Sequence, residues 1–160
     1  MRHSAFVTTT LAALIAFSAA PTYAGTAEDA FLSKLVGTWT GGGQLTGADN
    51  AAITCKLVFK PKSGAVNFSG KCDAEGLGMQ NFSGVISYND KTKKYEAAGA
   101  DQTAVGVKSG SSVVFTTKLR TMAGTGNSVM KVASNKIVID VEIARGPKDA
   151  LSKSHMILTK

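Results

Sequence analysis

Outside the first 24 positions, the residues that could do chemistry reduce to two cysteines, one histidine and a few scattered carboxylates. Cys55 and Cys72 are the only cysteines. In an oxidising compartment such a pair normally forms a disulfide, and without a third cysteine a cysteine-based zinc site is not expected. His155 is the single histidine beyond those positions, and the sequence lacks the nucleophile-elbow motif of many serine hydrolases. We therefore predict a disulfide and no enzymatic activity.

The acidic residues do not form a metal-ligand cluster in the sequence. Asp140 and Glu142 alternate with apolar residues, which predicts that both face solvent from one strand. Asp73 and Glu75 flank a turn beside Cys72, where a solvated loop is the simplest interpretation. We accordingly expect no metal site and no cofactor.

The first 24 residues have the organisation of a secretory signal peptide. A short basic start with Arg2 precedes an apolar stretch over residues 5–20, and residues 22–24 resemble a cleavage site that ends in a small side chain. The apolar stretch is too short for a stable membrane span. We expect a single domain over residues 25–160, located in the periplasm or secreted.

The charge distribution favours a solvated, lysine-rich surface over a nucleic-acid interface. The net charge is +7, and it becomes +6 if Arg2 leaves with the signal peptide. Fifteen of the 18 basic residues are lysines spread along the chain, whereas nucleic-acid surfaces usually cluster arginines and interleave aromatic residues. We predict no nucleic-acid partner, although a cationic surface also suits anionic lipid or an acidic partner.

The elements that position these residues begin with one short helix, expected over residues 26–36. Thr26 and Asp29 have the spacing of a capping box at its start. After Gly37 the hydrophobic period changes to two, which is the period of a strand. A glycine-rich run over residues 122–127 is expected to be a loop. The alternating segments lie near residues 53–59, 66–72, 82–88, 95–97, 105–107, 113–119, 129–133, 137–143 and 152–159.

Short strands at regular intervals, separated by turn signals, predict an all-β fold. The specific expectation is an antiparallel up-and-down β-barrel of 8–10 strands with a short N-terminal helix. Closure of the sheet would remove its exposed edges.

A hairpin about the turn at residues 61–64 predicts the first strand register. It places Phe59 opposite Phe68, and Cys55 opposite Cys72, on one face of the sheet. Directly opposed Cβ atoms lie about 4.5–5.5 Å apart, close to the distance that a disulfide spans. The register therefore predicts a Cys55–Cys72 disulfide independently of the compartment.

Trp39 is the only tryptophan, and it stands where the helix gives way to the first strand. A single large aromatic residue there usually fills one end of a core. The run Gly37-Thr38-Trp39 resembles the Gly-x-Trp signature of the calycins, the superfamily of lipocalins and avidins. Extended through Gly41 and Gly43, it is similar to the Gly-x-Trp-x-Gly-x-Gly motif of the nitrobindins, which are haem-binding barrels, and to uncharacterised bacterial lipocalin-like proteins.

Our leading hypothesis is an exported, non-enzymatic barrel that holds a small, largely apolar molecule. Small residues recur at alternating positions, at Gly41, Gly43, Gly70, Gly84 and Ala97. Either the side chains leave the lumen partly unfilled, or the glycines only permit the strands to coil. Six aromatic residues are the candidates for the inward lining or core: Trp39, Phe59, Phe68, Phe82, Tyr88 and Phe115.

Two alternatives use the same fold. Bacterial periplasmic metalloprotease inhibitors resemble this layout of a small calycin-type barrel with an early tryptophan and one disulfide. That resemblance implies a packed lumen and a protease contact near residues 25–28.

The nitrobindin resemblance instead implies haem held by a late histidine, for which His155 is the only candidate. Met156 and Leu158 form one apolar face of the last strand, so a period of two predicts that His155 points out of the barrel. Ile157 shares the face of His155, which leaves the inward orientation open. The oligomeric state is also left open by the sequence.

Overall fold

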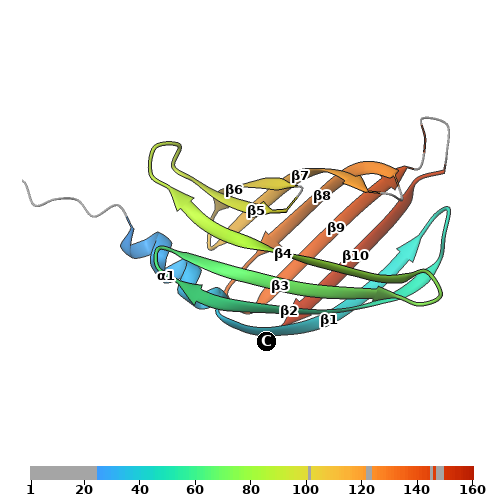
Figure 1. Cartoon of the computed structure of the whole chain (residues 1–160), viewed down its shortest axis with the longest axis horizontal. Coiled ribbons are helices and arrows are strands. Elements are labelled where there is room, and N and C mark those ends of the chain that lie inside the picture. Colours follow the sequence, from blue (N-terminus) through green and yellow to red (C-terminus); the bar gives the residue numbers. More distant parts are fainter. Residues whose placement is uncertain (1–24, 101, 122–123, 145, 147–149) are drawn as a thin grey trace, which may run out of the picture.

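The computed structural model describes residues 25–100, 102–121, 124–144, 146 and 150–160. Within them one helix precedes ten strands, which pair in chain order and close between β10 and β1 into an antiparallel barrel (Figure 1). The elements are α1 Thr26–Leu35, β1 Gly37–Thr46, β2 Ala51–Lys62, β3 Ala65–Ala74, β4 Gly78–Asn89, β5 Lys94–Gly99, β6 Thr103–Ser109, β7 Ser112–Thr121, β8 Gly124–Val132, β9 Lys136–Ala144 and β10 Ser152–Thr159. The expected all-β barrel with an N-terminal helix is confirmed. The predicted signal peptide, residues 1–24, lies outside the described residues.

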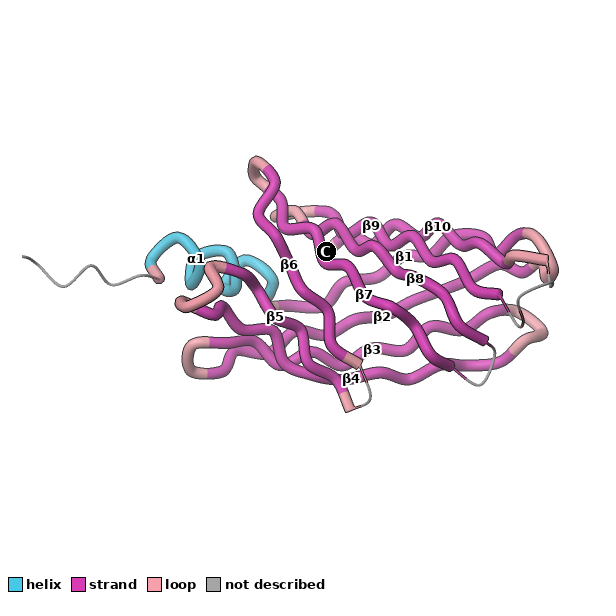
Figure 2. The backbone as a smooth tube through the Cα atoms, turned by 90° about the horizontal axis from the view of Figure 1, so that it is seen from above, coloured by secondary structure: helices cyan, strands magenta, loops and turns pink. Residues whose placement is uncertain are grey.

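The barrel has two different ends. α1 packs against β3 and β4 at one end, beside the β2–β3 and β4–β5 turns, and we call this the closed end (Figures 1 and 2). The β1–β2 and β3–β4 loops lie at the opposite end, which we call the mouth. No helix in the described part of the chain has the length and apolar character needed to cross a membrane.

Strand pairing assigns each residue to the lumen or to the outer wall. Alternate residues of β2, from Ala51 to Phe59, are buried and face the lumen. Because directly paired residues share a face of the sheet, the register carries this inner face around the barrel. Trp39 of β1 pairs with Leu57, and Met156 of β10 pairs with Gly43.

The predicted hairpin register and disulfide are confirmed. Phe59 pairs with Phe68, and Cys55 pairs with Cys72. The two cysteines form a disulfide across a sequence separation of 17 residues. A loop of that length corresponds to a stabilisation of about 3 kcal/mol in the chain-entropy model.

Three inner-face glycines lie directly opposite aromatic residues. The pairs are Gly70 with Phe82, Gly84 with Phe68, and Gly106 with Phe115. A Cβ added to these glycines would come within 2.5 Å, 2.7 Å and 2.6 Å of the facing ring, respectively. Each ring therefore occupies the space beside its glycine, so Gly70 and Gly84 do not leave the lumen empty.

The glycines of β1 have a different role. A Cβ on Gly41 or Gly43 would overlap the backbone carbonyl oxygen of Ile157 or His155 on the neighbouring β10. The missing side chains thus permit close approach between two backbones. At Gly41 and Gly43 this supports the interpretation that the glycines permit the strands to coil.

Two local predictions were wrong. Residues 124–127 belong to β8 and pair with β7, where a loop was expected, because strands on both sides supply hydrogen-bond partners. Gly126 suits this position because a Cβ there would overlap the carbonyl oxygen of Glu142. The predicted N-cap was also wrong: it is Gly25 and not Thr26, and Gly25 makes no side-chain cap hydrogen bond.

Candidate functional site

The closed half of the barrel is a filled aromatic and aliphatic core. Trp39 is 0% exposed, and Phe59 and Phe115 are also buried. The centre of the Phe31 ring on α1 lies 5.0 Å from the centre of the Tyr95 ring, and the centres of the Tyr95 and Phe115 rings lie 6.4 Å apart. The helix therefore seals this end with its own apolar side chains.

The C-terminal end of α1 is held by two side chains from the barrel. Trp39 Nε1 donates to the carbonyl oxygen of Leu35 at 2.8 Å. Lys160 Nζ donates to the carbonyl oxygen of Lys34 at 2.6 Å and lies 5.1 Å from the centre of the Trp39 ring. These bonds satisfy carbonyls that a helix end leaves without intrahelical partners. They tie α1 to β1 through Trp39 and to the residue that follows β10, Lys160.

Among the described residues, Tyr95 is the titratable group whose pKa departs most from its ordinary value. Burial, with smaller contributions from Glu28, Tyr88 and Asp29, raises the pKa of Tyr95 from 10.0 to about 12. Each of these influences disfavours the tyrosinate form. Tyr95 thus remains a neutral core residue through the physiological range.

The inner face toward the mouth is mostly apolar and is less completely buried than most of the closed half. Several side chains that face inward there are half-buried, whereas Ala51, Ile53 and Ser154 are buried. The disulfide lies between the two halves: Cys55 is buried, Cys72 is half-buried, and Met156 Sδ is 3.7 Å from Cys55 Sγ. The half-buried apolar residues of the inner face toward the mouth are Leu45, Phe82, Leu119, Val141 and Ile143.

Hydroxyl side chains interrupt this apolar lining, and three of them lie in one row. Thr117 pairs with Ser128, Ser128 with Val141, and Val141 with Ser154, so all three hydroxyls belong to one cross-strand row on the inner face. We call Thr117, Ser128 and Ser154 the hydroxyl row. Thr117 donates its proton to the carbonyl oxygen of Thr103 at 2.7 Å. The hydroxyls of Ser128 and Ser154 make no hydrogen bond within the described residues.

Ser154 is the most deeply placed member of the hydroxyl row. The residue is only 7% exposed. Among the described residues, every fully occluded polar side-chain atom has a hydrogen-bond partner. Because the Ser154 hydroxyl has none, its oxygen is not fully occluded, and its strand position places it on the inner face.

The six aromatic candidates divide between the two halves. Trp39, Phe59 and Phe115 are buried and packed, so they belong to the core. Phe68 and Phe82 are half-buried on the inner face, each covering a glycine. Tyr88 is half-buried against Tyr95, at a ring distance of 5.0 Å. Of the six candidates, Phe68, Phe82 and Tyr88 are thus the ones that are not fully buried.

His155 faces outward, as the period of two predicted. Its side chain is 61% exposed, and its Nδ1 lies 2.6 Å from Asp140 Oδ1 on β9. Asp140 and Glu142 are exposed too, as expected. A side chain on the outer wall does not fit the role of a haem ligand inside the lumen. No group of three or more His, Cys, Asp or Glu suited to a metal ion occurs among the described residues.

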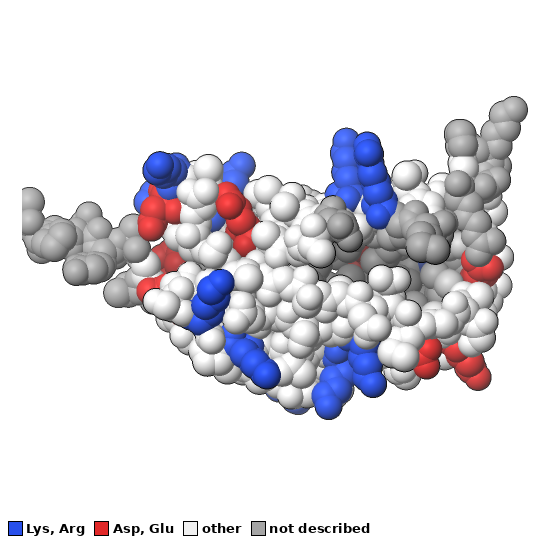
Figure 3. Space-filling model, in the orientation of Figure 1, with Lys and Arg blue, Asp and Glu red and all other residues white. Residues whose placement is uncertain are grey.

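Charged side chains lie on the outer wall in separate groups. Figure 3 shows lysine and arginine side chains at several places on one face of the molecule, with acidic residues between some of them. On the wall near the mouth, Lys153 Nζ pairs with Glu142 Oε1 at 2.9 Å. This exposed pair contributes little to stability.

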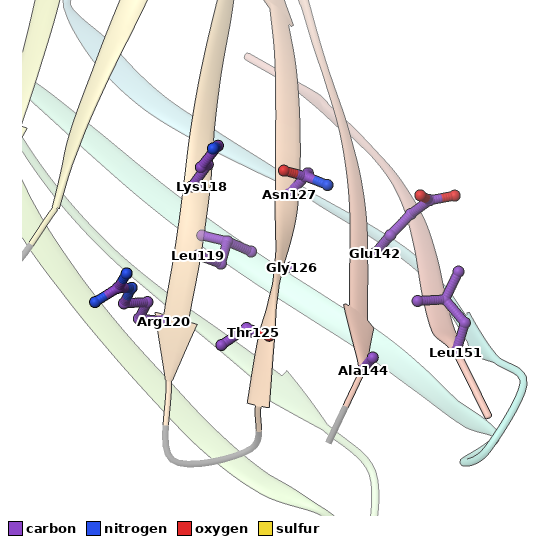
Figure 4. A pocket seen from close by; sticks show the side chains of 9 residues that line it. All are labelled: Lys118, Leu119, Arg120, Thr125, Gly126, Asn127, Glu142, Ala144 and Leu151. Carbon is purple, nitrogen blue, oxygen red and sulfur yellow. The ribbon is translucent and has the colours of Figure 1, made fainter. Parts of the chain in front are cut away.

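A hollow of about 500 Å³ lies at the rim of the mouth. Figure 4 shows that its lining comes from β7, β8 and β9 and from Leu151 before β10. Lys118, Arg120 and Glu142 face outward, whereas Leu119 belongs to the inner face. The hollow is therefore an open, mixed-charge depression beside the lumen, and it is less suited to an apolar molecule than the inner face.

The comparisons with known proteins concern the fold. No protein-family model matches the sequence, and no curated protein matches it significantly. The structure is similar to an S-type phycobiliprotein lyase, CPES, from Guillardia theta, with a TM-score of 0.61 and 10% identity over 83% of this chain and 92% of that chain. It is also similar to Rv2717c from M. tuberculosis, with a TM-score of 0.59 and 13% identity over 84% of this chain and 97% of that chain. At such identities the similarity shows a shared barrel architecture alone.

The hydroxyl row was missed by sequence reasoning. Ser128 alternates in phase with Met130 and Val132, and Ser154 alternates in phase with Met156 and Leu158. That phase was a usable signal, because it places both serines on the inner face. A hydroxyl among apolar neighbours attracts attention only once the barrel shows which inner positions remain accessible.

Proposed function

We propose that this protein is an exported, non-enzymatic barrel that binds a small, largely apolar molecule in the mouth half of its lumen. The observation that carries the proposal is the contrast in burial along one inner face. Most apolar side chains are buried in the closed half, whereas Leu45, Leu119, Val141 and Ile143 are half-buried toward the mouth. Leaving inward-facing apolar surface in contact with water is unfavourable, and an apolar ligand would cover it.

The fold and the disulfide support this proposal. A closed barrel with one sealed end forms a cup, and Cys55–Cys72 suits an oxidising compartment outside the cytoplasm. The similarity to a phycobiliprotein lyase, at 10% identity, supports only the architecture. The protease-inhibitor alternative, with a protease contact near residues 25–28, stays a prediction.

The test is titration with diphenylhexatriene, a hydrocarbon dye that fluoresces in apolar surroundings. We expect saturable binding of one dye per barrel. Ser128→Trp should abolish it by filling the lumen, whereas Val129→Trp should preserve it, because Val129 is the adjacent residue on the outer wall. Circular dichroism would verify that both variants are folded.

The opposite results would refute the proposal. A wild-type protein without saturable dye binding has no accessible apolar lumen. Equal binding by both tryptophan variants would place the dye elsewhere. If the wild-type protein passes this test, mass spectrometry of extracts from protein purified from its native envelope fraction would identify the natural ligand.

A further inference from the structure

We propose that the ligand is an electrically neutral amphiphile, with an apolar body and one uncharged hydrogen-bonding group held by the hydroxyl row. This inference rests on the proposed binding function and specifies the ligand class of the same lumen. Alcohols, esters and ketones belong to this class. Carboxylates and ammonium compounds do not.

The first argument is the absence of charge from the inner face of the mouth half. The described strands place no Lys, Arg, Asp or Glu on that face. Lys118, Arg120 and Glu142 all belong to the outer wall. Moving an ionised group from water into such a site is costly unless a partner of opposite charge awaits it. A charged head group would therefore be rejected from the lumen.

The second argument is the hydrogen-bonding capacity of the hydroxyl row. Ser128 and Ser154 have free hydroxyls within the described residues, and a hydroxyl can both donate and accept. Thr117 has committed its proton to Thr103, so it can only accept from a ligand. The row thus suits a carbonyl oxygen or a hydroxyl group, and a pure hydrocarbon would leave it unused.

Ser154 determines the depth of this polar contact. It is nearly buried yet has a lumen-facing oxygen, and it lies between Leu45 and Val141 on the inner face. A polar group at this depth gains most from a hydrogen bond, because little water competes there. The apolar body of the ligand would then contact Leu45 and Val141, which flank Ser154, and extend along Ile143 and Leu119 toward the mouth.

The experiment is displacement of bound diphenylhexatriene by 1-dodecanol and by laurate, which share a chain length and differ in head-group charge. We expect dodecanol to displace the dye at least about tenfold more effectively than laurate. Ser154→Ala and Ser128→Ala should each weaken dodecanol about fivefold. The affinity for the dye itself should not change, because the dye has no hydrogen-bonding group. Ser69→Ala on the exposed outer wall of β3 is the matched control.

Laurate that displaces the dye as well as dodecanol would overturn the neutral-ligand inference. Serine variants that bind dodecanol as well as the wild type and Ser69→Ala would overturn the role of the hydroxyl row. In both cases saturable dye binding would leave the proposed function intact. Absence of dye binding would refute the proposed function and this inference together.

Discussion

At the scale of single residues, Lys160 joins the chain end to the helix that seals the barrel. Its ammonium group combines a hydrogen bond to the carbonyl oxygen of Lys34 with a position over the Trp39 ring. Its aliphatic stem lies near Gly37, at which an added Cβ would be 3.5 Å from Lys160 Cε. One side chain thus serves the helix end, the tryptophan and the start of β1.

Lys160→Met should separate the charge of this residue from its packing. Methionine keeps an apolar stem but loses the hydrogen bond and the cation–π contact. We expect the free energy of unfolding to fall by about 1 kcal/mol in urea denaturation. The control is Lys136→Met, since Lys136 is exposed on neighbouring β9 at the same end of the barrel. Equal stability of the two variants would contradict the role given to Lys160.

Tyr95 makes the stability of the barrel depend on alkaline pH. Its pKa is about 12 in the folded protein, against an ordinary value of 10.0. The folded state therefore holds the phenolic proton more tightly, and this contribution is complete below pH about 10 and lost as pH rises toward about 12. The loss is on the order of 2 kcal/mol. Denaturation at pH about 9 and about 11 should show a larger fall for wild type than for Tyr95→Phe.

The tyrosinate absorbance spectrum offers an independent measurement. The difference between wild type and Tyr95→Phe should titrate with a midpoint well above that of a free tyrosine. A midpoint close to 10 would show that Tyr95 is neither buried nor influenced by Glu28 and Asp29 in the way described.

At the scale of elements, the glycine run of β1 allows the barrel to close. Gly41 and Gly43 lie where a Cβ would meet the backbone of β10, and Gly42 lies where it would meet the carbonyl oxygen of Ile53 on β2. β1 therefore approaches both neighbours more closely than a strand with side chains could. This is the strand at which the first and last parts of the sheet join.

Gly43→Ala should be strongly destabilising, because the obstruction is backbone and cannot rotate away. We expect a loss of about 2–3 kcal/mol in the free energy of unfolding. Thr40→Ala, at an exposed position of the same strand, should change stability by no more than about 0.5 kcal/mol. Thermal and urea denaturation of both variants would check this. A Gly43→Ala variant as stable as wild type would mean that the two strands lie further apart than described.

At the scale of the whole molecule, the barrel has a closed half and a mouth half. α1 supplies the apolar side chains that seal the first, and the second retains half-buried apolar residues and the hydroxyl row. His155 belongs to neither half, because it lies on the outer wall beside Asp140. The resemblance of the Gly37–Gly43 run to the nitrobindin motif therefore does not extend to a lumen-facing haem ligand at His155.

Added haem should give no stoichiometric shift of the Soret band. The imidazole of His155 points away from the lumen, and its Nδ1 is engaged by Asp140. We expect His155→Ala to leave any weak haem association unchanged in an absorbance titration. A saturable one-to-one spectrum that disappears in His155→Ala would overturn the outward placement of this residue.

Local features were predictable from the sequence because they depend on neighbours along the chain. The turn at Ser63 and Gly64 sets the register of β2 and β3, and this register alone places Cys55 opposite Cys72. The period of two likewise predicted that His155 faces outward, since its neighbour Met156 is apolar. The ten strands of the described residues fall within the predicted range of 8–10, because a period of two in hydrophobicity marks each strand locally.

Only the tertiary structure decided which inner positions are filled. Phe68 and Phe82 cover glycines of neighbouring strands, Gly126 continues a strand because β9 approaches it, and Lys160 reaches α1 from the other end of the chain. These relations join residues by strand tilt and barrel closure, which hydrophobic periodicity does not encode. The sequence by itself therefore determined the barrel and its disulfide, whereas the half-buried inner face toward the mouth and its hydroxyl row follow from how the closed sheet and the helix divide the interior.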